Sequence, residues 1–223
     1  MQEPGESVPG ISTVRAFSQG WEQRSADVLR RGGIVIYPTE TVYGLGCDPF
    51  NPKAVRRLKR MKGDKKPVRP FLILVPDALF AESMAAEVSD TARRLMQECW
   101  PGPLTLIFKA SSKAPEPVMA SNRAIAMRVS SDPVCRSLTS AFGPLVSTSA
   151  NLSGKEPAFR AVDAACCFAE KADLVIDDGD RGSEPPSTLV DVTSARPRIL
   201  RQGAVKCAFL LDLIRVEKGV DHA

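Results

Sequence analysis

The sequence contains a single histidine, His222, one residue before its C-terminal end. Nucleophilic mechanisms of the Ser-His-Asp or Cys-His type need a histidine as general base, so the composition argues against them. It argues equally against a metal centre built on imidazole ligands. Catalysis would therefore depend on carboxylates, hydroxyl groups, backbone amides, cations or a loosely held metal ion.

The sequence also lacks segments that would place it in a membrane. No run approaches the roughly 18 apolar residues of a spanning helix. The acidic, Pro- and Gly-rich start has neither the basic nor the apolar part of a signal peptide. The six cysteines include no CxxC pair and mostly lie in apolar segments, which is typical of buried, reduced thiols. We therefore expect a cytoplasmic protein without a zinc site and with no membrane partner.

Apolar residues make up 43% of the 223 residues, which is enough for one domain with a hydrophobic core. Short β-branched runs alternate with amphipathic segments, and this order predicts a single α/β domain with a mixed sheet and flanking helices. We expect the domain at residues 19–216, after a flexible lead-in at 1–18 and before a tail at 217–223. The predicted helices span 21–31, 52–62, 89–100, 133–142, 162–170 and 205–216. The predicted strands span 34–37, 71–75, 104–108, 124–129, 145–147, 174–176, 188–192 and 199–201, with a loop at 38–49.

Positive charge gathers in one stretch of the chain. Nine lysines and arginines lie between Lys53 and Arg69, with Asp64 as the only acidic residue, whereas the whole chain carries only +4. A solvated helix face beside a basic loop would explain this stretch, but such a face usually mixes both signs. We therefore favour an anion site, for either a nucleotide phosphate or an RNA backbone.

Two polar segments each follow a predicted strand. Residues 38–46 read PTETVYGLG, which fits an ordinary turn as well as a loop whose glycines let the backbone approach a ligand. Residues 147–154 read STSANLSG, where four hydroxyl groups and an amide offer hydrogen bonds to an anion. A helix cap would not need four hydroxyls, so we favour binding for the second segment. Neither segment matches a Walker P-loop or the GxGxxG fingerprint.

Together these motifs resemble the YrdC/Sua5 family. They occur in the family's order over about residues 20–205, and the pair PTxTxYGLG and STSANxSG is highly specific. The chain ends soon after ILRQG, so it resembles the short YrdC/TsaC form without the extra C-terminal domain of Sua5 proteins. The full order is PTETVYGLG, a basic KG segment, PGPLT (101–105), MRV (127–129), STSANLSG, STLVDV (187–192) and ILRQG (199–203).

The resemblance implies a fold and a reaction. The fold would be an α/β sandwich around a twisted sheet with a concave, basic face. The reaction would convert L-threonine, bicarbonate and ATP into threonylcarbamoyl-AMP and pyrophosphate, with Mg²⁺. The product would pass to a threonylcarbamoyl transferase complex that modifies adenosine 37 of ANN-decoding tRNAs. Such an adenylation can depend on positioning and cationic stabilisation, without histidine.

The resemblance also implies roles for individual residues on the amino-acid side of the site. Thr41 would meet the threonine substrate, and Arg128 would bind its carboxylate through a planar guanidinium. Ser147 and Ser187 would line the same pocket.

On the nucleotide side, Ser149 and Asn151 match the family's SxN element, and Arg201 would reach the phosphates of ATP or the adenylate. Lys62 matches the lysine of the family's KxR element, which would make it a catalytic and ATP-binding cation. Arg69 lies where another nucleotide contact falls.

The chain departs from the family pattern at one position. The KxR element would place an arginine at residue 64, and this chain has Asp64, whose charge would repel phosphates. Either Lys65, Lys66 or Arg69 supplies the missing cation, or the synthase activity is weak or lost. The second hypothesis is therefore a non-catalytic paralogue that binds tRNA or double-stranded RNA through its basic residues. A carbamoyl-adenylate enzyme with another acceptor ranks last, because such enzymes usually carry additional modules.

Overall fold

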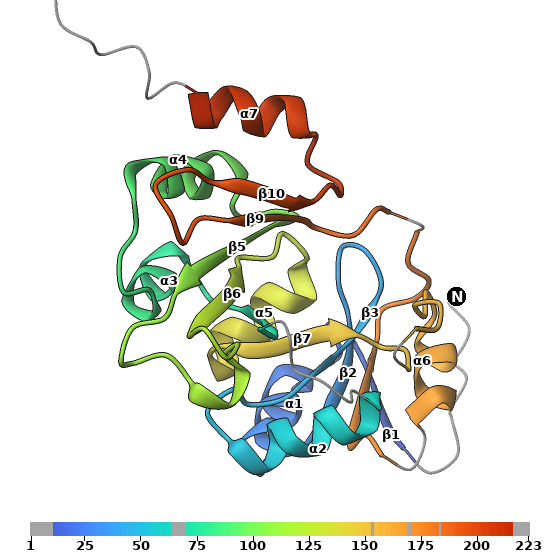
Figure 1. Cartoon of the computed structure of the whole chain (residues 1–223). Helices are drawn as coiled ribbons and strands as arrows, with labels where there is room; N and C mark the ends of the chain where they lie inside the picture. Colours follow the sequence, from blue (N-terminus) through green and yellow to red (C-terminus); the bar gives the residue numbers. More distant parts are fainter. Residues whose placement is uncertain (1–10, 64–69, 153, 169–170, 183, 216–223) are drawn as a thin grey trace, which may run out of the picture.

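The computed structural model describes residues 11–63, 70–152, 154–168, 171–182 and 184–215. Within these residues ten strands form one sheet, in the order β1-β8-β2-β3-β7-β4-β6-β5-β9-β10 (Figure 1). The sheet combines four parallel pairs (β1–β8, β2–β8, β4–β6 and β5–β9) with antiparallel ones, so the predicted α/β class with a mixed sheet is confirmed. The strands are β1 (Ser12–Arg15), β2 (Val35–Pro38), β3 (Tyr43–Gly46), β4 (Leu72–Leu74), β5 (Leu104–Lys109), β6 (Ala124–Arg128), β7 (Leu145–Ser149), β8 (Leu174–Asp177), β9 (Thr188–Asp191) and β10 (Arg198–Arg201).

Helices cover both faces of the sheet and bury two main apolar clusters. One cluster joins α1 (Trp21–Arg30) and α5 (Pro133–Phe142) to the sheet, and these two helices also pack against each other. The larger cluster takes side chains from the remaining α-helices. Among the described residues no helix is long and apolar enough to cross a membrane. The remaining α-helices are α2 (Pro52–Lys62), α3 (Ala78–Met84), α4 (Asp90–Cys99), α6 (Ala161–Phe168) and α7 (Cys207–Arg215).

Helix α2 begins and ends where its sequence indicates. The Asn51 side chain accepts hydrogen bonds from the backbone amides of Lys53 and Ala54, Pro52 occupies the first turn, and Gly63 ends the helix in the left-handed conformation. Its apolar residues Ala54, Val55, Leu58 and Met61 are buried and pack against the sheet. The basic side chains of α2 therefore lie on the remaining faces of the helix, with the exception of the buried Lys62.

Strand β3 lies inside the segment 38–49 that the sequence analysis predicts as a loop. It pairs antiparallel with β2 and with β7, so that prediction is wrong for residues 43–46. One of the glycines that suggested a turn, Gly46, is needed for close packing within the sheet. A Cβ atom at Gly46 would lie 2.7 Å from the Tyr37 ring and 2.9 Å from the Leu145 side chain. Strands tolerate glycine at such close approaches.

Two further elements differ from the sequence prediction. Strand β1 pairs with β8 and lies inside the segment 1–18 that was expected to be a flexible lead-in. Helix α3 was not predicted, because a seven-residue helix with only Ala81 and Met84 buried offers too little periodicity. Its local start signal is nevertheless present, since the Asp77 side chain accepts a hydrogen bond from the Phe80 amide at 2.7 Å.

Strand β7 shows how the sheet leaves room for a ligand. Leu145 is fully buried in the cluster beneath α1 and α5. Side chains alternate along a strand, so Ser147 and Ser149 project from the same face as Leu145. Both serines line a cavity instead of packing under a helix. The polar end of β7 is therefore open to a ligand, while its apolar end holds the fold together.

Candidate active site

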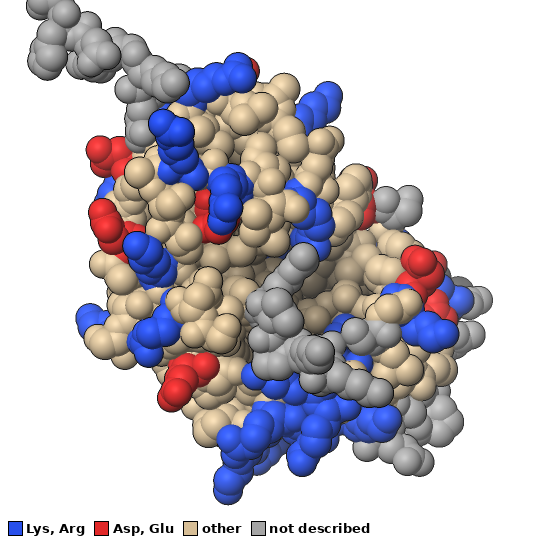
Figure 2. Space-filling model, in the orientation of Figure 1, with Lys and Arg blue, Asp and Glu red and all other residues tan. Residues whose placement is uncertain are grey.

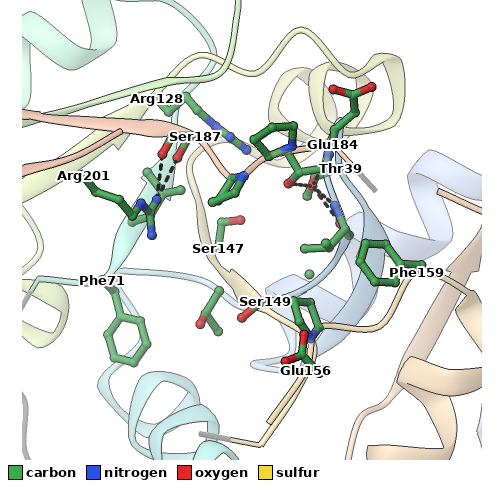
Figure 3. A pocket seen from close by; sticks show the side chains of 18 of the residues that line it. Thr39, Phe71, Arg128, Ser147, Ser149, Glu156, Phe159, Glu184, Ser187 and Arg201 are labelled. Carbon is green, nitrogen blue, oxygen red and sulfur yellow. Dashed lines mark hydrogen bonds between the residues drawn. The ribbon is translucent and has the colours of Figure 1, made fainter. Parts of the chain in front are cut away.

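A cavity of about 840 Å³ lies where the polar ends of several strands meet. Its volume falls within the range of small-molecule sites. Figure 3 shows Arg128, Ser187 and Arg201 along one side, Thr39, Glu184 and Phe159 along the other, and Ser147 and Ser149 between them. Six residues that the sequence predicts for substrate and nucleotide binding line this one cavity: Thr41, Arg128, Ser147, Ser149, Ser187 and Arg201.

The turn between β2 and β3 brings Thr41 to the cavity. The Thr39 hydroxyl accepts hydrogen bonds from the backbone amides of Thr41 and Val42, both at 3.2 Å, and donates to the Val42 carbonyl at 2.7 Å. The Thr39 and Thr41 hydroxyl oxygens also lie 3.2 Å apart. A threonine side chain that bonds the backbone two and three residues on closes such turns. Thr39 thus fixes the conformation that presents Thr41.

Arg128 is the most deeply buried charge at the cavity. It ends β6, and only 4% of its side chain is exposed. One guanidinium nitrogen, Nη2, lies 3.2 Å from a carboxylate oxygen of Glu40. Its Nε is buried and has no hydrogen-bond partner among the described residues. Because Arg128 lines the cavity, its guanidinium is a candidate contact for an anionic ligand.

Ser187 and Arg201 form a second polar corner. Arg201 donates through Nη2 to the backbone carbonyl of Ser187 at 2.8 Å and to its hydroxyl at 3.3 Å (Figure 3). The Ser187 hydroxyl also lies 2.9 Å from that of Thr105, which is buried at the start of β5. Thr105 is therefore a supporting residue that the sequence analysis did not single out, although it closes the PGPLT motif.

Lys62 and Asn151 do not line the cavity. The Lys62 ammonium is buried and donates to the backbone carbonyls of Ser149 and Asn151, both at 2.7 Å, and to the Asn151 side-chain oxygen at 3.3 Å. The Asn151 side-chain amide in turn donates to the carbonyls of Leu152 and Lys155. In this structure both side chains hold the end of β7, where Ser149 lies, and the loop that follows it against the end of α2.

Aromatic and acidic side chains complete the lining. Lys59 lies over the Phe71 ring, with its Nζ 5.5 Å from the ring centroid, and donates to the Pro117 carbonyl at 2.9 Å. Phe159 stands on the opposite side, as Figure 3 shows. Glu156 and Glu184 are exposed and bring two carboxylates to the cavity. Lys59 is one of the nine basic residues that the sequence analysis placed in an anion site. The sequence analysis did not indicate Phe71, Phe159, Glu156 or Glu184 as part of the site.

Some of the predicted residues cannot be placed. Arg69 and Asp64, and with them the question of the missing KxR arginine, lie outside the described residues, as does His222. Among the residues described, no cluster of three or more His, Cys, Asp or Glu side chains could hold a metal ion. All six cysteines are free, but only three of them are buried (Cys47, Cys99 and Cys135). Burial raises the pKa of the Cys47 thiol to about 12, which makes it a poor nucleophile at neutral pH.

Comparison with known proteins connects this cavity to a family. A family model described as Sua5_yciO_yrdC, telomere recombination, matches residues 27–203. The chain is 40% identical over 192 residues to the threonylcarbamoyl-AMP synthase of Halorhodospira halophila, covering 83% of this chain and 94% of that protein. It is 38% identical over 186 residues to the threonylcarbamoyl-AMP synthase of Vibrio cholerae, covering 81% and 96%.

Solved structures agree. Sua5 of P. abyssi in complex with L-threonine superposes with a TM-score of 0.85 at 31% identity, covering 92% of this chain and 61% of that one. The chain thus spans about three fifths of that Sua5. YciO of E. coli superposes with a TM-score of 0.78 at 27% identity, covering 88% of this chain and 96% of that one. By its sequence motifs, its fold and these matches over most of its length, the chain belongs to the Sua5/YciO/YrdC family.

Proposed function

We infer that this protein is a threonylcarbamoyl-AMP synthase, which uses ATP to activate the carbamate formed from L-threonine and bicarbonate. Relatives that are 35–40% identical and are covered over most of their length are named for this activity. The observation that carries the assignment is the convergence of Thr41, Arg128, Ser147 and Ser187 on one cavity. These residues come from four different strand ends or turns, and the fold brings them together.

On the amino-acid side, we assign the threonine carboxylate to Arg128. Arg128 lines the cavity, and its planar guanidinium suits a carboxylate. Hydroxyl groups of Thr41, Ser147 and Ser187 surround it and supply donors and acceptors for the remaining polar groups of the substrate. A site that hydrogen-bonds a substrate hydroxyl rejects an analogue that lacks it. The pocket should therefore prefer threonine to amino acids without a side-chain hydroxyl.

On the nucleotide side, we assign phosphate contacts to Ser149 and Arg201, with Lys59 as a further cation at the cavity. The reaction joins a carbamate oxygen to the α-phosphorus of ATP and breaks the bond to the β-phosphate oxygen, so negative charge develops on pyrophosphate. Fixed cations and hydroxyl donors stabilise that charge without acid–base chemistry by histidine. Lys62 and Asn151 support this side by holding the loop after Ser149, and the predicted nucleotide contact of Arg69 belongs to the same proposal.

Mg²⁺ would enter this site with the nucleotide. The described residues hold no cluster of three protein ligands, but the carboxylates of Glu156 and Glu184 line the cavity. Mg²⁺ at nucleotide sites is commonly bound by substrate phosphates with one or two carboxylates, so the donors present fit such an ion. Its contribution would be to neutralise phosphate charge.

Contact with RNA is a second proposal, favoured by the surface of α2. Lys53, Arg56 and Arg60 are exposed on this helix, and the helix has no acidic residue. Figure 2 shows basic side chains gathered over α2, beneath the hollow in this face. Such a ridge suits a phosphate backbone, either of tRNA or of double-stranded RNA. Delivery of the product to a threonylcarbamoyl transferase complex and a cytoplasmic location complete the proposal.

The decisive experiment for the synthase is the release of pyrophosphate from ATP and bicarbonate, with and without L-threonine. We expect release only when threonine is present. If folded protein with Mg²⁺ released no pyrophosphate, the synthase assignment would fail. Salt-sensitive RNA binding that was weakened by Arg56→Gln and Arg60→Gln would then support the non-catalytic RNA-binding alternative.

A further inference from the structure

Glu40 is the third residue of the PTETVYGLG motif, yet it does not line the cavity. Its neighbours Thr39 and Thr41 both do, whereas the Glu40 side chain turns to the other side of the β2–β3 turn. There its carboxylate meets the Nη2 of Arg128 at 3.2 Å and the segment that follows β6. Only 15% of the Glu40 side chain is exposed. Glu40 is therefore outside the cavity lining but in direct contact with Arg128, the residue that we assign to the substrate carboxylate.

The hydrogen-bonding capacity of this carboxylate is fully used. One oxygen accepts from Arg128 and from the Ser130 hydroxyl at 2.9 Å. The other accepts from the Ser131 amide at 3.2 Å and from the Ser131 hydroxyl at 3.4 Å. An ionised carboxylate has about four acceptor sites, so little capacity is left for another ligand. A role as a general base or a metal ligand would require breaking these contacts.

The segment that holds Glu40 is itself anchored. The Ser130 hydroxyl accepts from the amide of Asp132, which caps the start of α5 and is buried. The second carboxylate oxygen of Asp132 pairs with Arg181 at 3.1 Å. Burial raises the pKa of Asp132, and the neighbouring Arg181 opposes this shift. The hydroxyl and amide donors around Glu40 therefore have well-defined positions, and so has its carboxylate.

We propose that Glu40 is a positioning residue that fixes the guanidinium of Arg128 for the substrate carboxylate. By taking one nitrogen of a long, flexible side chain, it holds the guanidinium of Arg128, a residue that lines the cavity, in a defined orientation. It also compensates the buried positive charge while the site is empty. This role rests on the proposed function, because it concerns the threonine side of the same site.

The test compares Glu40→Gln with Glu82→Gln. Glu82 also pairs with an arginine, Arg93, but on the surface and away from the cavity, so its variant removes the same charge from an arginine–glutamate pair that does not border the site. The readouts are the KM for threonine and the KM for ATP in pyrophosphate release. For Glu40→Gln we expect the KM for threonine to rise about 10- to 100-fold, as for a misplaced binding group, with the KM for ATP unchanged. Glu82→Gln should change neither.

Ser130→Ala provides a milder variant that keeps the ion pair and removes one hydrogen bond to Glu40. It should raise the KM for threonine less than Glu40→Gln does, and it keeps the test valid if Glu40→Gln fails to fold. An unchanged KM for threonine in both variants, or an equal loss for threonine and ATP, would overturn the role of Glu40. If wild type itself showed no threonine-dependent release, the proposed function would fail and this role with it.

Discussion

Replacing Arg128 by methionine tests the threonine side of the cavity at its buried charge. Methionine keeps most of the apolar stem, so the change removes the guanidinium with little loss of packing. Hydrogen bonds to a charged group contribute about 1.5–3 kcal/mol each. Two such bonds to a substrate carboxylate correspond to about 3–6 kcal/mol, or roughly a 140- to 20,000-fold rise in the KM for threonine.

The same substitution leaves Glu40 without its cationic partner. Removing one member of a buried pair costs about 3–5 kcal/mol, and the low end applies because Glu40 keeps its contacts with Ser130 and Ser131. Domains are typically stable by about 5–15 kcal/mol, so the variant should still fold. Its unfolding midpoint in denaturant should fall accordingly.

The assay measures initial rates of pyrophosphate release against threonine at saturating ATP, together with the affinity for a non-hydrolysable ATP analogue. Arg93→Met is the matched control, because Arg93 pairs with Glu82 on the surface. We expect that the rate of pyrophosphate release by Arg128→Met no longer saturates over the threonine range used for wild type. The affinity for the ATP analogue should be unchanged. A folded Arg128→Met protein with the threonine KM of wild type would refute the assignment of the substrate carboxylate.

Two further predictions follow from buried polar groups. Lys62→Met should lower the free energy of unfolding by about 3 kcal/mol and raise the KM for ATP, because three oxygens of Ser149 and Asn151 lose their charged donor. Denaturant unfolding and the KM for ATP in pyrophosphate release would be measured on the same variant. An unchanged KM for ATP would argue against this role of Lys62. Burial raises the pKa of Tyr43 from 10.0 to about 12. The folded state therefore retains a proton that the unfolded chain loses, and stability present below pH 10 should fall by up to about 3 kcal/mol as pH rises through about 12. Tyr43→Phe should remove this part of the alkaline loss, and equal slopes in both proteins would contradict it.

Much of the fold was predictable because local signals and tertiary packing agree. Helix α5 follows its prediction at both ends, and α2 has a complete set of start and stop signals in Asn51, Pro52 and Gly63. Strand β3 could not be found in this way, because its two glycines usually indicate a turn. One of them, Gly46, is required by a close approach to Tyr37 and Leu145, which becomes visible only when β2 and β7 flank the strand.

The site was predictable residue by residue but not contact by contact. The motifs indicated Thr41, Arg128, Ser147 and Ser187, and all four line one cavity. The pairing of Glu40 with Arg128 spans 88 residues of sequence, and no local pattern indicates such a contact. The same holds for the ammonium of Lys62, whose acceptors lie 87 and 89 residues further along the chain. Long-range contacts of this kind depend on the sheet order, which the sequence analysis did not predict.

The most direct test of the synthase assignment is identification of the product. Purified protein would be incubated with ATP, Mg²⁺, L-threonine and ¹³C-bicarbonate, and the nucleotides analysed at once by mass spectrometry. The synthase predicts an adenylate that contains both threonine and one ¹³C atom, formed in step with pyrophosphate. If pyrophosphate or ADP appeared without this labelled adenylate, or if no nucleotide were consumed by folded protein, the assignment would be contradicted.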